Sequence, residues 1–226
     1  TANSAAFAVR ADNVYTDANQ NLSVSISGTP TGGNYEALTT TGTITNTVVD
    51  DADATTVTLT ASAASVAEGA SVTYTATVAN AVTGTPLVVT LDNGSTITIA
   101  VGQTTANSAA VIVRADDVYN QGTTNVVRSI TGTTGGNYEA LTTTSTVSTT
   151  VTEDADATTV TLSSATAGSN VTEGGSIVYT ATVSSAVTGT PLLVTLSNGQ
   201  TISIPVGQTT ANSAAFAVRA DNVYTD

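Results

Sequence analysis

Histidine, cysteine, lysine, tryptophan and methionine are all absent from this 226-residue chain, and these absences narrow the possible functions. Without cysteine there is no disulfide, no thiolate zinc site and no thiol nucleophile. Without histidine and lysine, the commonest general base and the Schiff-base amine are missing as well. The sequence also contains no serine-hydrolase or phosphate-loop motif. We therefore expect a protein that is not an enzyme.

Positive charge is scarce too, since 17 acidic residues face four arginines and the formal net charge is −13. A surface of this sign repels nucleic acid and anionic membranes, so we expect neither as a partner, whereas divalent cations would be attracted. No apolar run approaches the roughly 18 residues that a membrane span needs. The sequence begins at Thr1 without a signal peptide, and we expect the native ends, with any secretion signal, to lie outside it.

What the chain does contain is a repeat of about one hundred residues. The string TANSAA starts at Thr1, Thr105 and Thr210, and residues 1–17 are identical to residues 210–226. Three further strings occur twice: GGNYEALTT from Gly32 and Gly135, DADATTVTL from Asp51 and Asp154, and Glu-Gly at Glu68 and Glu173. This pattern predicts the C-terminal part of a first repeat at 1–49, a complete repeat at 50–152 and the N-terminal part of a third at 153–226.

Within the complete repeat, apolar and polar residues alternate with a period of two, which is typical of half-buried β-strands. Seven such runs are separated by turns rich in Gly, Asn and Asp, and no run has the period of a helix. The pattern predicts an all-β fold of tandem immunoglobulin-like repeats, each a seven-stranded antiparallel β-sandwich. The residues expected to point inward are Val72, Tyr74, Val78, Val89, Leu91, Ile99 and Val113.

Arg128 interrupts this alternation, because it stands where the first copy has Val24. Two interpretations are open. Either the register of the strand shifts, or the aliphatic part of the arginine lies along an edge while its charge reaches solvent.

The acidic residues are concentrated at one pole of the predicted repeat. A chain that crosses the sandwich seven times enters the repeat at one pole and leaves it at the other. Glu68, Asp92 and Asp116 all fall in turns at the pole where the chain leaves. By this count, 15 of the 17 acidic residues lie on loops at that pole or on the linkers that follow. The other two, Glu36 and Glu139, face the preceding linker. Carboxylates are therefore expected to gather at the junctions between repeats.

Carboxylates crowded into a junction repel one another unless a cation neutralises them. Oxygen ligands without nitrogen or sulfur suit Ca²⁺, which accepts six to eight oxygens in flexible geometry. Acidic residues are also ordinary turn formers, and Asp92 in an Asp-Asn-Gly turn fits that simpler interpretation. We predict Ca²⁺ at the junctions, centred on Glu68, Asp116, Asp117, Asp154 and Asp156. The full candidate set is Glu68, Asp92, Asp116, Asp117, Glu153, Asp154, Asp156, Asp12, Asp50, Asp51, Asp53, Glu173 and Asp221.

Several strings carry a resemblance that extends over the whole chain: SVAEGASVTYTATV, TPLVVTLDNGSTITIAVGQTT, ADDVY, GGNYEALTT and DADATT. They resemble the repeats of large type I-secreted biofilm adhesins of Gram-negative bacteria, the LapA and Bap-like group. The acidic layout also resembles Calx-β domains, which implies that Glu68, Asp92, Asp116, Asp117, Glu153, Asp154 and Asp156 bind calcium. The partial copies depart from this pattern, since Asn13 and Asn222 replace Asp117 and Ser197 replaces Asp92. The resemblance implies an extracellular stalk on a bacterial cell surface.

Two alternatives remain beside the stalk. Threonine runs such as Thr39 to Thr43 suggest a glycan- or surface-binding module, although threonine is also an ordinary strand residue and sugar-stacking aromatics are scarce. A self-assembling filament subunit is the other alternative, because neither 1–49 nor 153–226 can close a sandwich alone, and open edges invite pairing. The expected partners are therefore neighbouring repeats, in the same long chain or in adjacent subunits.

Overall fold

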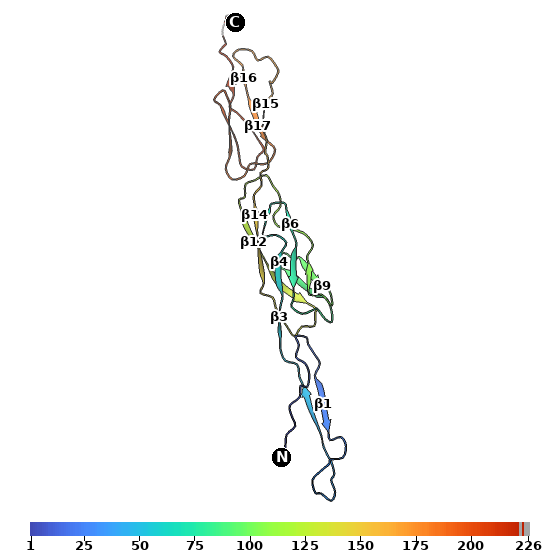
Figure 1. The fold of residues 1–226 in the computed structure, drawn as a ribbon. Helices are drawn as coiled ribbons and strands as arrows, with labels where there is room; N and C mark the ends of the chain where they lie inside the picture. Colours follow the sequence, from blue (N-terminus) through green and yellow to red (C-terminus); the bar gives the residue numbers. More distant parts are fainter. Residues whose placement is uncertain (222, 224–226) are drawn as a thin grey trace. The chain divides into compact units, whose positions relative to one another are not determined.

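The computed structural model describes residues 1–221 and 223, and every regular element in them is a β-strand (Figure 1). The all-β prediction is confirmed. The chain forms two compact units, one comprising residues 1–66, 70–113 and 124–151, and the other comprising 67–69, 114–123 and the chain from 152 onward. A helix long and apolar enough to cross a membrane does not occur in the described residues.

The first 49 residues contribute a β-hairpin to the first unit. Its strands, β1 (Gln20–Ser25) and β2 (Thr43–Val48), pair antiparallel from Gln20↔Val48 to Ser25↔Thr43. They form a two-stranded sheet in which most side chains are exposed. The pattern of the sequence suggests about three strands here, but the segment that joins β1 to β2 contains Pro30 and several glycines and has no regular structure.

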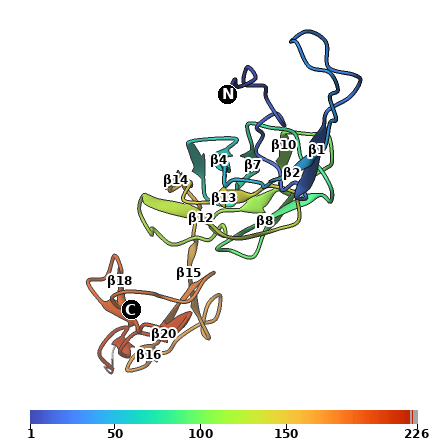
Figure 2. The same cartoon turned by 90° about the horizontal axis from the view of Figure 1, so that it is seen from below.

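The complete repeat consists of short strands that follow one another through turns. They are β3 (Ala54–Thr56), β4 (Thr58–Ala61), β5 (Ser65–Ala67), β6 (Ser71–Val72), β7 (Tyr74–Thr77), β8 (Leu87–Leu91), β9 (Thr96–Ile99), β10 (Thr105–Asn107), β11 (Val111–Ile112), β12 (Thr124–Thr134), β13 (Ala140–Thr142) and β14 (Thr146–Thr152). Two sheets dominate, one in the order β10-β7-β4 and one in the order β5-β14-β12-β8-β9. Figure 2 shows β8 and β12 side by side, as their register requires.

These two sheets share one hydrophobic core, built on the period-two alternation of the sequence. Leu87, Val89 and Leu91 of β8 are buried, while the residues between them are half-buried, because successive strand side chains point to opposite faces. Of the seven residues predicted to point inward, six are buried, and Val113 is partly buried against the same core. Burying a side chain such as Ile99 contributes roughly 1.5–3 kcal/mol.

The strands depart from a simple seven-stranded antiparallel pattern, and Val57 shows why. Its side chain is buried, and its amide donates a hydrogen bond to the carbonyl of Thr142 at 2.9 Å. Before this residue β3 pairs with β13, and these two strands run parallel; after it β4 pairs antiparallel with β7. The apolar run around Val57 therefore contributes strands to two sheets. The alternation of apolar and polar residues alone does not predict this change of sheet.

Arg128 keeps the register of the strand. It pairs with Val147 just as Val24 pairs with Ile44 in the first copy. Its guanidinium Nη1 lies 3.4 Å from Asp92 Oδ2 and also donates to the carbonyl of Val127. The arginine stem therefore runs to a carboxylate, close to the second interpretation, although the register of β12 against β8 does shift further on, between Ile130 and Gly132.

The second unit repeats part of this arrangement. Its strands are β15 (Val160–Ser164), β16 (Ser176–Ile177), β17 (Tyr179–Val183), β18 (Leu192–Thr195), β19 (Thr201–Ile204), β20 (Thr210–Asn212) and β21 (Phe216–Ala217). Ala181, Val183, Ile202 and Ile204 form its buried core. In the complete repeat β8 lies between β12 and β9, whereas β18 pairs with β19 alone among the described residues. The three repeat boundaries inferred from the sequence stay a prediction.

Candidate metal sites

Three separate segments meet around Glu68, all within the second unit. The Glu68 amide donates to the carbonyl of Thr152 at 3.0 Å, and the Gly69 amide donates to the carbonyl of Arg114 at 2.9 Å. Gly69 has φ +71°, and a Cβ there would lie 2.8 Å from Cβ of Asp116, so only glycine permits this approach. The Glu-Gly turn, the loop from Arg114 and the linker after Thr152 are thus held together by their backbones.

This packing brings the carboxylates of Glu68, Asp116 and Asp154 together, with one oxygen of each within 4.8 Å of the others. Asp116 and Asp154 are exposed, but Glu68 is only 5% exposed. Its Oε1 atom is buried and has no hydrogen-bond partner among the described residues. A buried carboxylate oxygen without a partner costs free energy unless a proton or a cation compensates it.

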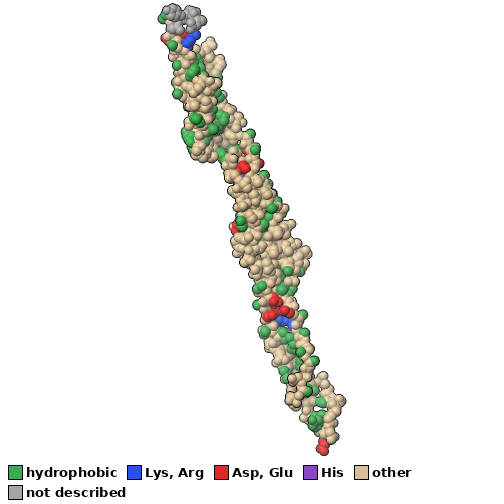
Figure 3. All heavy atoms as spheres, turned by 60° about the vertical axis from the view of Figure 1, so that its left-hand side comes forward, with side chains coloured by type: hydrophobic (Ala, Val, Ile, Leu, Met, Phe, Trp, Pro, Cys, Tyr) green, Lys and Arg blue, Asp and Glu red, His purple; other side chains and the backbone are tan. Residues whose placement is uncertain are grey.

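Arg114 supplies part of that compensation on the other side of Glu68. Its Nη2 lies 3.2 Å from Glu68 Oε2 and 3.4 Å from Glu153 Oε2, and its Nη1 donates to the carbonyl of Gly122 at 2.8 Å. The arginine therefore pairs with Oε2 of Glu68 and leaves Oε1 without a hydrogen-bond partner among the described residues. In the space-filling view, a compact group of acidic side chains with a basic side chain beside it is visible in the lower half of the picture (Figure 3).

The titration of these groups reflects the crowding. Hydrogen bonding to Glu153, burial and the charge of Glu153 raise the pKa of Glu68 to about 7, against the lowering effect of Arg114. Burial acts to raise the pKa of Glu153, but hydrogen bonds from Glu68 and from the amides of Gln121 and Gly122 outweigh it, so that pKa is lowered. The charge of Asp116, followed by burial, raises the pKa of Asp156. Without a metal, the Glu68 carboxyl therefore holds its proton to a higher pH than an ordinary glutamate does.

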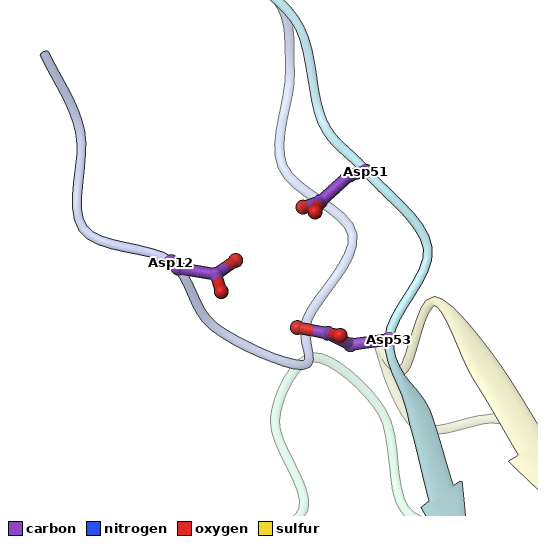
Figure 4. A group of neighbouring side chains, drawn as sticks. All are labelled: Asp12, Asp51 and Asp53. Carbon is purple, nitrogen blue, oxygen red and sulfur yellow. The ribbon is translucent and has the colours of Figure 1, made fainter.

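A second cluster lies in the first unit, where Asp12, Asp51 and Asp53 also place carboxylate oxygens within 4.8 Å of one another. Figure 4 shows the three side chains pointing toward a common space, Asp12 from a loop and the other two from the segment that leads into β3. The charges of Asp51 and Asp53 raise the pKa of Asp12. This cluster is more exposed than the one at Glu68.

Glu139 lies beside this second cluster, although its place in the repeat did not make it one of the predicted ligands. Its Oε2 accepts a hydrogen bond from the amide of Asp53, which confirms that it faces the preceding linker. That bond lowers its pKa, but burial and the charges of Asp50, Asp53 and Asp51 raise it more. Its Oε1 is buried without a hydrogen-bond partner among the described residues. The recurrence of GGNYEAL was the signal that could have pointed to it.

Three further candidates have carboxylates that already pair with an arginine or accept a backbone amide: Asp50, Asp92 and Asp117. Asp50 lies 2.6 Å from Arg10 and accepts the amide of Asp17. Asp92 accepts the amide of Ser129 in addition to its contact with Arg128. Asp117 accepts the amide of Tyr119 at 2.8 Å, as Asn13 does from Tyr15 at 2.8 Å. Asparagine can therefore replace this aspartate without loss of the turn.

The remaining candidates lie near the cluster at Glu68 or in the third copy. Glu153 and Asp156 line a small cavity of about 120 Å³ together with Asp117 and Asp154. Glu173 lies 3.1 Å from Arg219, and a Cβ on Gly174 would approach Asp221 to 3.1 Å, which repeats the contact of Gly69 with Asp116. Asn222 and Asp226, which the repeat assigns to the same acidic loop, lie outside the described residues.

An all-β chain in which acidic loops recur from copy to copy has the character of a repetitive structural protein. The sequence model of the LapA domain matches residues 53–155 and 156–226, which is most of the chain. The chain therefore belongs to the LapA domain family, as its resemblance implies. A comparison with curated proteins found no match. Membership of this family points to an adhesin-related, structural role at the cell surface or outside the cell.

Proposed function

We propose that the chain is an extender segment, or stalk, of a bacterial cell-surface adhesin that supports adhesion and biofilm formation. In this proposal Ca²⁺ binds the acidic clusters and stiffens the junctions between consecutive repeats. The observation that carries the metal site is Oε1 of Glu68, a buried carboxylate oxygen without a donor beside two further carboxylates.

The donor set fits calcium. Three carboxylates from three segments offer several oxygens, the site has no nitrogen or sulfur ligand, and Asp116 and Asp154 leave it open to solvent. Calcium tolerates such irregular oxygen sets and often completes its coordination with water. Calcium at Glu68 would compete with the proton that the raised pKa favours, and its charge would offset the repulsion among Glu68, Asp116 and Asp154.

The mechanical consequence follows from the segments that these ligands belong to. Glu68 and Asp116 lie on loops of the complete repeat, whereas Asp154 lies on the linker that leads to the next repeat. A cation held by all three would tie the linker to the loops. Without the cation, repulsion among the carboxylates favours a looser linker.

Small-angle X-ray scattering with calcium and with EDTA tests the stalk, and calorimetry tests the site. We expect calcium to increase the maximum dimension and reduce the flexibility of the chain, with a dissociation constant of about 0.1–1 mM as in extracellular modules. Asp116→Asn combined with Asp154→Asn should remove both effects. Asp92→Asn is the matched control, because this carboxylate belongs to neither cluster.

Two results would contradict the proposal separately. Absence of binding heat at millimolar calcium would eliminate the metal site. Binding with unchanged dimension and flexibility would retain the site but refute its role in stiffening.

A further inference from the structure

Two tyrosines in the first unit, Tyr15 and Tyr138, face each other across an isolated antiparallel β-bridge. The residue after each tyrosine donates its amide to the carbonyl of the residue before the other one, at 2.9 Å and 3.1 Å. The tyrosines are therefore a non-hydrogen-bonded pair, the arrangement in which opposite side chains lie closest together. In the repeat inferred from the sequence, Tyr15 belongs to the first copy and Tyr138 to the complete one, so the bridge joins consecutive repeats.

The rings of these two tyrosines lie side by side. Their centroids are 5.5 Å apart and their planes are inclined by 32°. The hydroxyl of Tyr15 donates to the carbonyl of Ala81 at 2.6 Å, and the hydroxyl of Tyr138 donates to the carbonyl of Asn80 at 2.7 Å. Because these two acceptors are consecutive residues, one short segment holds both hydroxyls. The carbons ortho to the hydroxyls are thus brought to the same end of the contact.

Two glycines let the chain before Tyr138 take up this position. Gly136 has φ +70°, and a Cβ on it would lie 3.0 Å from Cδ2 of the Tyr138 ring. A Cβ on Gly135 would lie 2.2 Å from the carbonyl oxygen of Pro86. Any other residue at these positions would push the segment away, so the place of the Tyr138 ring depends on backbone geometry as well as on its hydroxyl.

Tyrosine is also the side chain of this protein that is most readily oxidised by one electron. Cysteine, methionine, tryptophan and histidine, which otherwise take up oxidising equivalents, are absent. The chain has seven tyrosines, and the contact of Tyr15 with Tyr138 is the one between aromatic rings in the part that the structure describes. Both side chains are half-buried, so a small oxidant can reach them. A radical on one ring therefore has a second tyrosine as its immediate neighbour.

We propose that Tyr15 and Tyr138 form a cross-linking site, at which a peroxide-dependent one-electron oxidant joins consecutive repeats through a dityrosine bond. The class of oxidant is a haem peroxidase acting with hydrogen peroxide. The tyrosines supply both halves of the bond, and the bridge and the two carbonyls hold them in place for it.

The chemistry of the cross-link balances with one molecule of peroxide. Each phenol loses one electron and its hydroxyl proton, and the two resulting radicals form a carbon–carbon bond between their ortho carbons. Each of these carbons then releases its hydrogen as a proton while its oxygen takes one up, which restores both phenols. The two electrons and two protons removed at the start reduce hydrogen peroxide to two molecules of water.

Both halves of the site recur in the sequence. Tyr119 occupies the position of Tyr15 in the complete repeat and donates its hydroxyl to the carbonyl of Ala186 at 2.7 Å, as Tyr15 does to Ala81. The string GGNYEALTT, which contains Tyr138, occurs from Gly32 as well. The same pair is therefore expected wherever two complete repeats follow one another. Neither tyrosine is a candidate metal ligand, so this proposal stands or falls independently of calcium.

The test is oxidation of the full 226-residue chain at low concentration in EDTA, with a haem peroxidase and hydrogen peroxide, followed by trypsin digestion of the monomeric fraction. Trypsin cleaves after the four arginines, which places Tyr15 in peptide 11–114 and Tyr138 in peptide 129–219. We expect mass spectrometry to find these two peptides joined, with the loss of two hydrogen atoms. Fragmentation should place the bond between Tyr15 and Tyr138.

Phenylalanine variants identify the partners, because they retain the ring and remove only the phenol. Tyr15→Phe and Tyr138→Phe should each lower the yield of the joined peptides at least tenfold, with an unchanged circular-dichroism spectrum. Tyr35→Phe is the matched control, since Tyr35 lies in the same tryptic peptide as Tyr15 but is 72% exposed, and it should leave the yield unchanged. Absence of the joined peptides from the oxidised wild type would overturn the proposal, as would a yield that Tyr15→Phe leaves unchanged or that Tyr35→Phe abolishes.

Discussion

Glu68→Gln is the most informative single change at the acidic cluster, because it should have opposite effects with and without calcium. In EDTA the wild-type carboxylate is buried, its Oε1 atom has no donor, and its pKa is raised to about 7. Glutamine has nearly the same shape, carries no charge and can donate its amide hydrogens to neighbouring carboxylates. We therefore expect the variant to be more stable than the wild type in EDTA above pH 7.

In calcium the order should reverse. A ligand that binds only the folded state at one hundred times its dissociation constant adds about 2.7 kcal/mol of stability. For a domain of roughly 60–100 residues each kcal/mol shifts Tm by about 4–8 °C, so the wild type should gain about 11–22 °C. Glutamine offers one neutral oxygen in place of a carboxylate, so the variant should lose most of this gain.

Differential scanning calorimetry of both proteins, in EDTA and in saturating calcium, measures this reversal directly. Asp92→Asn serves as the control and should retain the full calcium-dependent shift, since Asp92 interacts with Arg128 and Ser129 instead. If Glu68→Gln shows the same calcium-dependent shift as the wild type, the buried oxygen is not a ligand and the reasoning fails.

Two further predictions concern pH and the core. The folded-state pKa of Glu68, about 7, exceeds its ordinary value of 4.5, so the folded protein holds this proton more tightly than the unfolded chain does. Urea titrations in EDTA measure the free energy of unfolding. The stabilising contribution of Glu68 to it should be intact below pH 4.5 and lost as the pH rises through 7. A rise in the stability of the wild type over this window, relative to Glu68→Gln, would contradict this prediction. Ile99→Ala, at a fully buried site, should lower the free energy of unfolding by about 2–5 kcal/mol, whereas Val101→Ala, at an exposed one, should change it by less than about 0.5 kcal/mol.

The sequence predicted the strands and the core, whereas the metal sites that it indicates stay a prediction. Alternation is a local property, so it identified Tyr74 and Leu91 as buried. The change of sheet at Val57 depends on a hydrogen bond to Thr142, which no local pattern encodes. Counting the strand crossings placed Glu68 at the same pole as Asp116 and Asp154. The count could not show which carboxylates pair with an arginine or accept a backbone amide.

That distinction depends on hydrogen bonds made across the fold. Asp50 and Asp92 have arginine partners that are distant in sequence, and Asp117 bonds to the amide of Tyr119. The substitution of Asn13 at the position of Asp117 hinted at this role, because asparagine makes the same turn bond. Glu139 was missed for a different reason, since its proximity to Asp53 arises only when β13 pairs with β3 in the folded repeat.

The carboxylate cluster and the tyrosine contact at a junction should respond differently to pH, salt and divalent cations. The loop that contains Asp12 and Tyr15 contributes to both. Asp12 belongs to an acidic cluster, whose repulsion depends on pH, ionic strength and divalent cations. Tyr15, on the same loop, is held by a ring contact and by a hydrogen bond to the carbonyl of Ala81, neither of which involves a charge. Removal of calcium should therefore loosen the linker while the tyrosine contact persists. A stalk built in this way would change its stiffness with the ions around it without separating its repeats.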